Sequence, residues 1–552
     1  MSRSVEIESA GSETLPAPAK AMQHGKALTG ARFVIFALAA LVIIGFGLRL
    51  GGISAIGFAE DEVNKLNAVR AYEQGDIRPN AEHPMLMKSL IFISMRVEQA
   101  WNTRSASAIS DETAVRFPNI LFGALTAIPL FLLTAIFFDR WTGLLTAALW
   151  AFGINAITYN RIAKEDTLLV FFMLFAFYFY ARAKQISWRE KRAKRRNYNL
   201  SAVSFGLMMA SKYFPHYFGL NMLYHHYYRL RKKEPGEPSG KTPWYFYILV
   251  GVVFLIANPA VLLPQTWHYL TAYSSEQLLT HTGYLMGDVL YKNNPSGTPF
   301  WGTPFYFYLL FLLIKVPLPV LVAFLAGLVV CIRDWRHPGH GFLLLMFLLW
   351  IIPYSFFGAK WLRYTLSLMP FVYMIAAVGI VALVRLAASL FKGKISVQAL
   401  RFASITALAV FVAWPAWTAY ANSPHFAAYT NALGGNRAGY YFPHDEFYDD
   451  GLREAIEFVC RNAPQGAVIV HETPGVVGYY LEKFGRTDLE SRILSAKDFS
   501  LAPISKPTFI IIQRGRTYFE NQEKMKTVRA TFEKVFEVKV HDTVAAEVYL
   551  AR

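Results

Sequence analysis

The feature that most constrains the fold is a series of long apolar runs separated by short polar segments. A helix of about 20 apolar residues crosses the hydrocarbon core of a bilayer. The composition agrees, because 54% of the residues are hydrophobic and only 17% are charged, against about 25% charged in soluble domains. We therefore predict a mainly α, polytopic transmembrane bundle of about eleven spans. The expected spans lie near residues 33–50, 117–138, 141–158, 167–183, 199–211, 213–228, 243–263, 304–332, 341–357, 364–386 and 402–420.

Lysines and arginines concentrate in four of the polar segments, at 182–198, 229–241, 333–336 and 392–401. With eleven spans, these segments and the N-terminus share one side, which the positive-inside rule makes cytoplasmic. The formal net charge of +17 therefore reflects membrane orientation better than nucleic-acid binding. The segments predicted to face the opposite side are 51–115, 159–166, 264–303, 358–363 and everything after residue 420.

Three regions follow from this pattern. Residues 1–32 are polar and expected to be a disordered cytoplasmic segment, and 33–420 form the membrane domain. Residues 421–552 are richer in charge and alternate short strand-like runs with helical patterns, which predicts a small extracytoplasmic α/β domain. The predicted strands lie at 467–470, 509–512 and 547–550, and the predicted helices at 451–462 and 519–534. The two cysteines, Cys331 and Cys460, fall in different regions and are not expected to pair.

An acidic pair, Asp61-Glu62, lies in the predicted outer loop 51–115, shortly after the first span. Ionisable groups at a membrane edge are costly to desolvate and are functional candidates. One carboxylate could act as a general base toward an acceptor hydroxyl. The alternative is a solvated loop or the first turn of a helix, where acidic side chains are favoured.

A second motif in the same loop runs from Glu82 through His83 and Pro84 to Lys88. His83 and Lys88 could donate hydrogen bonds to an anionic group such as a phosphate. Glu82 is a candidate for acceptor binding. The alternative is a helix N-terminus that carries a lysine with a buried stem.

Further charged residues are predicted to reach the same membrane face. Arg116 precedes the second span, and Arg161 and Asp166 lie between the third and fourth. Together with Asp61 and Lys88, they suit a lipid-linked phosphate and a hydroxyl acceptor. Charged residues also occur at the ends of spans simply because the chain leaves the membrane there. The convergence of several loops at one face therefore carries more weight than any single motif.

The loop 264–303 adds His281 and Tyr284 as candidates for covering the site or binding an acceptor, although a structural role for this histidine is the simpler reading. The sequence contains no HExxH, CxxC, GxxxxGK[ST] or GxSxG pattern. Zinc hydrolysis, nucleotide hydrolysis and serine hydrolysis therefore lack support.

The order of these motifs resembles the GT-C type of membrane glycosyltransferases. It is most similar to the superfamily of protein O-mannosyltransferases and aminoarabinose transferases (glycosyltransferase family 39 and relatives). That superfamily has an Asp-Glu pair after the first span, as in Asp61-Glu62, followed by a His-Pro-Pro-Leu-Gly-Lys or Glu-Lys-Pro-Pro stretch. Here the stretch is His83-Pro84-Met85-Leu86-Met87-Lys88, with Met in place of the second Pro and the Gly.

The resemblance continues to about residue 460. The matching motifs are Arg116-Phe117-Pro118-Asn119, Arg161 with Asp166, Ser211-Lys212-Tyr213, Lys360-Trp361-Leu362-Arg363-Tyr364 with Pro370, Tyr429-Thr430-Asn431, Gly434-Gly435-Asn436-Arg437 and Asp449-Asp450-Gly451. The C-terminal α/β region resembles no domain of the superfamily, including the β-trefoil of some eukaryotic members.

The resemblance implies transfer of a monosaccharide from a polyprenyl-phosphate sugar, with inversion, to a hydroxyl or phosphate on a protein, lipid or envelope glycan. Asp61 would be the base and Glu62 a supporting or structural neighbour, and Asp166 would either assist at the acceptor or orient a basic residue. The residues implied to bind the donor phosphate are His83, Lys88, Arg116, Arg161 and Arg363. No metal or other cofactor is expected, because these cations would stabilise the leaving phosphate.

The resemblance also implies a bacterial inner-membrane protein with an extracytoplasmic site. Two other classes stay open on the sequence. A transporter or flippase of a lipid-linked or envelope precursor would also place charges along a path, although inverted repeats, common in transporters, are not visible here. A non-catalytic membrane scaffold would tolerate simultaneous substitution at the candidate site residues.

Overall fold

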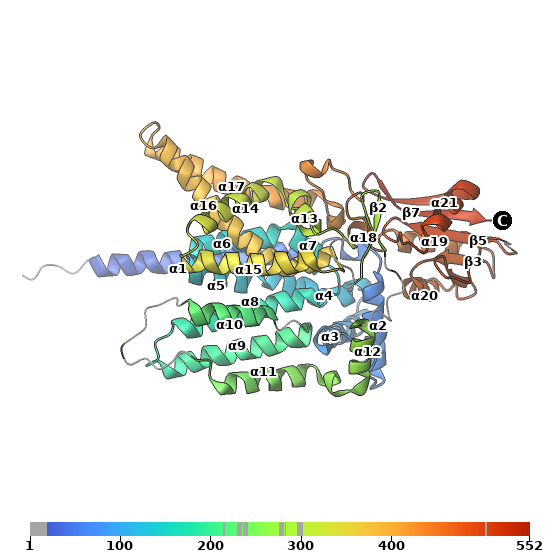
Figure 1. The fold of residues 1–552 in the computed structure, drawn as a ribbon, viewed down its shortest axis with the longest axis horizontal. Coiled ribbons are helices and arrows are strands. Elements are labelled where there is room, and N and C mark those ends of the chain that lie inside the picture. Colours follow the sequence, from blue (N-terminus) through green and yellow to red (C-terminus); the bar gives the residue numbers. More distant parts are fainter. Residues whose placement is uncertain are drawn as a thin grey trace, which may run out of the picture.

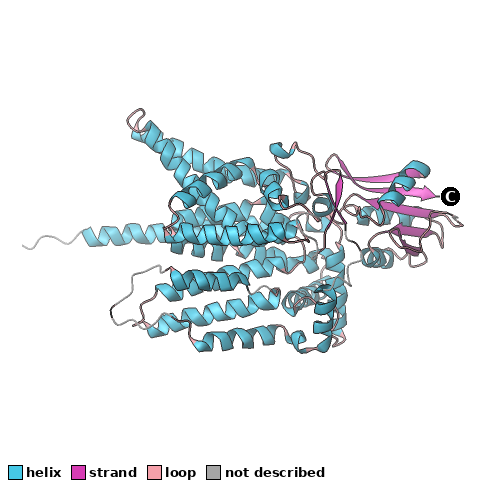
Figure 2. Cartoon of the chain, in the orientation of Figure 1, coloured by secondary structure: helices cyan, strands magenta, loops and turns pink. Residues whose placement is uncertain are grey.

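The computed structural model describes residues 19–213, 216–228, 235, 241–274, 281, 283–294, 302–502 and 505–551. A helical bundle makes up most of the molecule, and a mixed sheet lies at one of its ends, beside the C-terminus (Figures 1 and 2). Residues 1–18 and most of the basic loop 229–241 lie outside the described part, so the predictions for them are not addressed. The predicted disordered segment 1–32 differs from the structure from Ala19 onward, where the first helix begins.

Helices occupy each of the eleven ranges expected to span the membrane. They are α1 (Ala19–Leu50), α4 (Asp111–Leu125), α5 (Ala127–Phe137), α6 (Arg140–Phe152), α7 (Ile154–Asn160), α8 (Asp166–Gln185), α9 (Lys191–Ser211), α10 (His216–Tyr227), α11 (Trp244–Ala257), α13 (Phe307–Lys315), α14 (Leu318–Arg333), α15 (Pro338–Phe356), α16 (Met369–Phe391) and α17 (Val397–Ala421).

Fewer of these helices have both the length and the apolar composition needed to cross a membrane. In the described part of the chain, six spans are long and apolar enough to cross a bilayer, or seven if the bent pair of α6 and α7 counts as one crossing. Two further apolar helices, α11 and α14, are shorter. The protein is therefore a multi-pass membrane protein, and the count of eleven spans stays a prediction.

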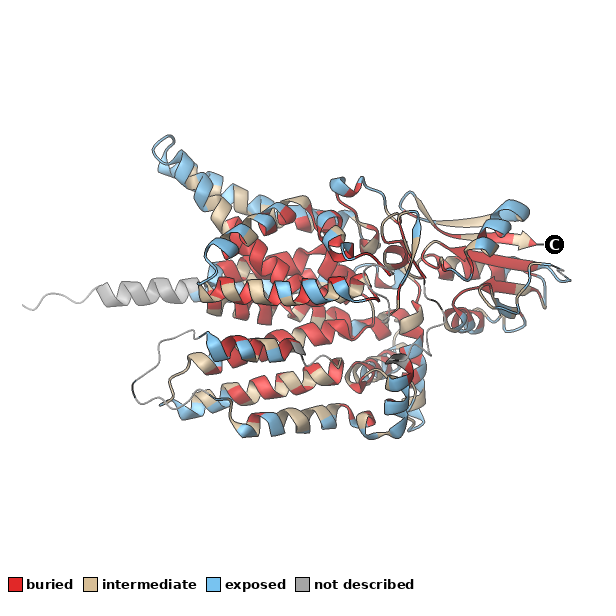
Figure 3. Ribbon diagram, in the orientation of Figure 1, coloured by how far each residue is buried: buried red, intermediate tan, exposed pale blue. Residues whose placement is uncertain are grey.

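Close helix packing in the bundle depends on glycine. At Gly327 of α14 an added Cβ would lie 1.9 Å from the carbonyl oxygen of Ile375, and at Gly379 of α16 it would lie 1.9 Å from that of Ala323. Small residues let membrane helices approach backbone to backbone. The side chains around this crossing are buried, whereas those on the outside of the bundle are exposed, as expected of a surface that faces lipid (Figure 3).

The end of the bundle beside the sheet carries the loop predicted to hold the site. Its helices are α2 (Glu60–Glu73) and α3 (Met85–Asn102). Three acidic residues occupy the first turn of α2, where they complement the helix dipole, and Pro84 precedes α3. Helix α12 (Pro264–Ser274) and the hairpin of β1 (Gly283–Met286) and β2 (Val289–Lys292) complete this end. Short 3₁₀ turns are η1 (Ile53–Ala55), η2 (Pro259–Leu262), η3 (Leu362–Ser367), η4 (Phe426–Ala428) and η5 (Ala432–Gly434).

The C-terminal region forms a five-stranded sheet with the strand order β4-β3-β5-β7-β6. Strand β3 pairs in parallel with β4 and β5, and β7 runs antiparallel to β5 and β6. The elements are α18 (Pro443–Phe447), α19 (Leu452–Asn462), β3 (Val468–His471), α20 (Pro474–Lys483), β4 (Glu490–Ile493), β5 (Thr508–Gln513), α21 (Gln522–Thr531), β6 (Glu533–Val540) and β7 (Thr543–Ala551). The predicted strands and helices of this region are thus confirmed, and both cysteines are buried and free.

A shared apolar core joins this region to the helices beside the bundle. Val63 and Leu66 of α2 lie in one buried cluster with Val476 and Tyr480 of α20. The hydroxyl of Tyr480 also accepts a hydrogen bond from the backbone N–H of Phe58. The sheet is therefore packed directly against the loop that carries the candidate site.

Candidate functional site

Asp61 lies at the start of α2, where three donors converge on one of its carboxylate oxygens. Oδ2 lies 2.7 Å from Nζ of Lys164, 2.6 Å from the hydroxyl of Tyr448 and 3.4 Å from Nη1 of Arg363. In the described part of the chain, Oδ1 accepts no hydrogen bond. The Asp61 side chain is 23% exposed.

The charges around Asp61 keep it ionised. Burial on its own would raise the pKa of the Asp61 carboxyl, but the positive charges of Lys164 and Arg363 outweigh that effect and hold the pKa well below its usual range. Burial lowers the pKa of Lys164 to about 8. The site thus offers a permanent carboxylate beside two cations.

A second ion pair contributes its carboxylate to the cavity around Asp61. Asp166, at the start of α8, accepts a hydrogen bond of 2.6 Å from Nζ of Lys212, which follows α9. The side chains that line this small cavity are Asp61, Tyr159, Ile162, Lys164, Asp166, Arg363, Asp445 and Tyr448. The structure therefore brings Asp61, Asp166 and Arg363 together, as the sequence predicted, and adds Lys164 and Lys212 to the cations at the site.

Asp445 lines both this cavity and a neighbouring one, as do Ile162 and Tyr448. It accepts hydrogen bonds from the hydroxyl of Tyr284 and from the backbone N–H of Leu362. Burial raises the pKa of Asp445 to about 6, although Tyr284 and the charge of Arg363 act in the opposite direction. Tyr284 thus reaches the site through Asp445.

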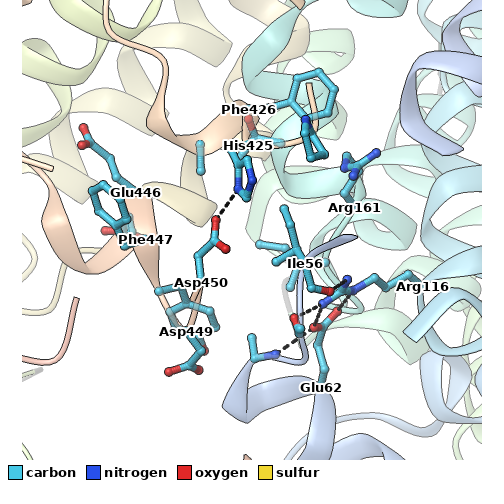
Figure 4. A pocket seen from close by; sticks show the side chains of 18 of the residues that line it. Ile56, Glu62, Arg116, Arg161, His425, Phe426, Glu446, Phe447, Asp449 and Asp450 are labelled. Atoms are coloured by element: carbon cyan, nitrogen blue, oxygen red, sulfur yellow. Dashed lines mark hydrogen bonds and ion pairs between the residues drawn. The ribbon is translucent and has the colours of Figure 1, made fainter. Parts of the chain in front are cut away.

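Glu62 and Arg116 form a buried pair that has no free polar group to offer a ligand. Arg116 donates from Nε and Nη2 to the two carboxylate oxygens of Glu62, at 2.9 and 2.6 Å. Its remaining donors bind the backbone carbonyls of Ile53, Ile56 and Gly57. All five N–H groups of Arg116 are therefore used to hold the chain between α1 and α2 (Figure 4).

Arg161 holds the preceding part of the same segment. It donates to the backbone carbonyls of Arg49, Gly51 and Gly52, and its guanidinium lies 4.9 Å from the ring centre of Phe426. Arg161 and Phe426 face the second cavity, where His425 also pairs with Asp450 (Figure 4).

The motif from Glu82 to Lys88 lies one layer behind Asp61. Lys88 is buried and donates to the backbone carbonyls of Asn80 and His83, and Glu82 accepts a hydrogen bond from Asn80. Nδ1 of His83 lies 3.8 Å from Glu165. None of these three side chains lines the cavity around Asp61.

His281 lies apart from the Asp61 cavity. Its ring stacks on Tyr518 with centroids 4.1 Å apart, and Nε2 lies 3.8 Å from Glu472. These contacts connect the loop before β1 to the C-terminal region.

Sequence reasoning missed Tyr448 and Asp445, and it gave no role to Lys164 or Lys212. The two lysines carried a signal, because each stands next to a motif residue at a predicted span end. Tyr448 and Asp445 carried none, since they come from a region of the chain more than 380 residues after Asp61.

Comparison with known proteins supports the predicted resemblance. Residues 99–263 match the family described as dolichyl-phosphate-mannose-protein mannosyltransferase. The crystal structure of apo ArnT from Cupriavidus metallidurans aligns with 95% of this chain and 98% of its own, with a TM-score of 0.51 and 12% identity. The chain has the GT-C fold. The fold predicted from the motifs is therefore confirmed over nearly the whole chain, and residues 99–263 match the family model.

Two other solved structures align at lower scores. ArnT from C. metallidurans bound to undecaprenyl phosphate covers 94% of this chain and 98% of its own, with a TM-score of 0.48 and 12% identity. The apo oligosaccharyltransferase from Archaeoglobus fulgidus covers 83% of this chain and 64% of its own, with a TM-score of 0.46 and 12% identity. No curated protein matches the chain in sequence.

Proposed function

We propose that this protein is an integral-membrane glycosyltransferase that moves a monosaccharide from a polyprenyl-phosphate donor to an acceptor on a protein, lipid or envelope glycan. The observation that carries the proposal is the ionised, partly exposed Asp61, which shares one cavity with Lys164, Arg363 and Asp166, the ion-pair partner of Lys212. The match of residues 99–263 to a family named for a dolichyl-phosphate-mannose donor supports the donor class.

In the proposed reaction, Oδ1 of Asp61 accepts the proton of an acceptor hydroxyl as the acceptor oxygen attacks the anomeric carbon. The new carbon–oxygen bond forms while the bond from the anomeric carbon to the phosphate oxygen breaks. The electron pair of that bond leaves with the polyprenyl phosphate, so a single displacement inverts the configuration. In this proposal Asp166, which lines the same cavity and pairs with Lys212, orients the acceptor.

The leaving phosphate needs positive charge, which the cavity supplies. Arg363 is 23% exposed and makes one long contact to Asp61, so most of its N–H donors stay available for a phosphate. Lys164 and Lys212 add two point charges. Preorganised cations of this kind stabilise developing negative charge, and we expect no divalent metal or other cofactor to be needed.

The predicted topology gives the proposed site its location. We propose that the protein lies in a bacterial inner membrane, with the N-terminus in the cytoplasm and both the site and the C-terminal region outside. The C-terminal sheet and Asp61 share one end of the bundle, so whichever side holds one holds the other (Figure 1).

The test uses purified protein and a panel of polyprenyl-phosphate monosaccharides, with the release of polyprenyl phosphate as the readout. Loss of a general base costs about 10²- to 10⁴-fold in rate, and we expect that loss for Asp61→Asn. Asp76→Asn is the matched control, because it makes the same change in the same loop at an aspartate that pairs only with Arg78 at the surface. Near-normal turnover by Asp61→Asn would contradict the assignment of the base.

A further inference from the structure

Tyr448 connects the C-terminal region to Asp61. It follows α18, and its hydroxyl donates a hydrogen bond of 2.6 Å to Oδ2 of Asp61, although 387 positions separate the two residues. The Tyr448 ring lies 5.1 Å from the guanidinium of Arg516. A residue from outside the membrane bundle thus touches the proposed base directly.

The backbone of Tyr448 has a conformation that is unfavourable for a side chain of this size. Its φ is 48° and its ψ is −105°, and residues other than glycine rarely adopt a positive φ. Gly515 packs against this backbone, and a Cβ added there would lie 2.8 Å from the carbonyl oxygen of Tyr448. Strained residues persist where their surroundings hold them, and such positions cluster at functional sites.

A buried ionic clamp, formed by Asp449, Arg516 and Gln513, holds Tyr448 in place. Arg516 and Gln513, at the end of β5, bind the carboxylate of Asp449: Nε and Nη2 of Arg516 lie 2.8 and 2.6 Å from its two oxygens, and Nε2 of Gln513 lies 3.0 Å away. The same carboxylate accepts the backbone N–H of Glu60 at 2.8 Å. Glu60 precedes Asp61, so the clamp fixes both partners of the Tyr448–Asp61 hydrogen bond.

We propose that Tyr448 is a positioning residue for Asp61, and that the C-terminal sheet serves the reaction by holding it through this clamp. Tyr448, Lys164 and Arg363 all contact Oδ2. The carboxylate is thereby fixed in one orientation, with Oδ1 left to accept the proton of the acceptor. The inference rests on the proposed function and extends it to a region outside the membrane bundle.

The alternative is that Tyr448 only contributes to packing between the sheet and the bundle. A second tyrosine–aspartate hydrogen bond in the same protein serves as a control that distinguishes these two interpretations. Tyr479 of α20 donates to Asp111, at the start of α4, over the same distance of 2.6 Å, and it also joins the C-terminal region to the bundle. A packing role predicts similar effects for Tyr448→Phe and Tyr479→Phe, whereas a positioning role predicts a loss of turnover in the first alone.

The experiment measures kcat and the donor KM of wild type, Tyr448→Phe and Tyr479→Phe, together with their melting temperatures. Misplacing a reacting group by about 1 Å can cost about 100-fold in rate. We expect Tyr448→Phe to lower kcat by about 10- to 100-fold with unchanged donor KM and melting temperature, and Tyr479→Phe to keep its kcat. Equal kcat values for Tyr448→Phe and wild type would overturn the proposal.

A double-mutant cycle tests whether Tyr448 acts through Asp61. If it does, adding Tyr448→Phe to Asp61→Asn causes no further loss of the residual rate, and a full additive loss would contradict the proposal. Should Tyr448→Phe fail to fold, Arg516→Lys tests the clamp, because lysine cannot make both bonds to Asp449. Its control is Arg529→Lys, at an exposed arginine that pairs with Glu547. Arg516→Lys is expected to lower kcat, and an unchanged kcat would overturn the proposal.

The two proposals fail in different ways. If Asp61→Asn abolishes transfer while Tyr448→Phe and Arg516→Lys do not affect it, the inference about the C-terminal region is wrong and the proposed function stands. If Asp61→Asn retains normal transfer, the base assignment is wrong and the inference falls with it.

Discussion

Three arginines that the sequence predicts as phosphate ligands occupy different environments. Arg116 divides its donors between Glu62 and backbone carbonyls after α1, and Arg161 donates three hydrogen bonds to backbone carbonyls at the end of α1 and just after it. Arg363 lies in the cavity with Asp61 and retains most of its donors. A sequence motif shows that an arginine is present, but its role depends on which acceptors lie within reach after folding.

Replacing Arg116 or Arg363 with methionine is predicted to affect different properties: protein stability in the first case and donor binding in the second. Arg116→Met leaves the fully buried Glu62 without its charged partner, which costs about 3–5 kcal/mol of stability. Arg363→Met leaves folding intact and raises the donor KM by about tenfold, as loss of one charge-assisted hydrogen bond would. Melting temperatures and donor titrations distinguish the two, and a normal melting temperature for Arg116→Met would contradict the structural role.

Asp445 is predicted to make stability depend on pH. Its folded pKa of about 6 lies above the ordinary value of 3.8 for an aspartate, so folding favours the protonated form. The stabilising contribution is present at low pH and is lost as pH rises through about 6. Asp445→Asn keeps the neutral form, so we expect it to melt above wild type at about pH 7 and to converge with wild type below about pH 4. Parallel melting curves across this pH range would contradict the assignment.

At the scale of elements, sequence periodicity located helices and strands well but not their breaks. Each predicted span coincides with a helix, because long apolar runs have few alternatives in a membrane. The break between α6 and α7 occurs at Gly153, where a Cβ would lie 2.1 Å from the hydroxyl of Tyr373. At this bend the Gly153 backbone packs against a side chain from α16, a contact that the local sequence does not contain.

The crossing of α14 and α16 gives a prediction at this scale. Gly379→Leu forces a side chain into the carbonyl oxygen of Ala323, which an added Cβ alone already approaches to 1.9 Å. Overpacking of this kind costs about 1–3 kcal/mol or more. Gly251→Leu in α11 is the control, since nothing lies within 4 Å of an added Cβ there. The melting temperature in detergent is expected to fall for Gly379→Leu and to stay unchanged for Gly251→Leu. Equal melting temperatures for the two variants would contradict the tight crossing.

At the scale of the whole molecule, the sequence predicted the membrane bundle, the α/β region and the outer loop that carries Asp61. It did not predict that the α/β region would complete the cavity through Asp445 and Tyr448. Apolar runs and motif order are local properties that a single sequence displays. The approach of Tyr448 to Asp61 across 387 positions is set by packing of the sheet against α2, which no local pattern encodes.

The predicted topology can be measured by cysteine labelling in intact cells. Both native cysteines are buried, so the background is expected to be low. An impermeant maleimide should label Glu520→Cys, at an exposed position of the C-terminal region. It should label Arg192→Cys, in the exposed first turn of α9, only after the cells are opened. The reverse pattern would contradict the proposed orientation.

The most direct test of the central claim is mass spectrometry of envelope glycolipids and glycoproteins from cells with and without the gene. We predict that deletion removes a single monosaccharide from one class of acceptor. The wild-type gene should restore that sugar, and the Asp61→Asn variant, present at the same level in the membrane, should not. An unchanged set of glycans after deletion, or restoration by Asp61→Asn, would contradict the account.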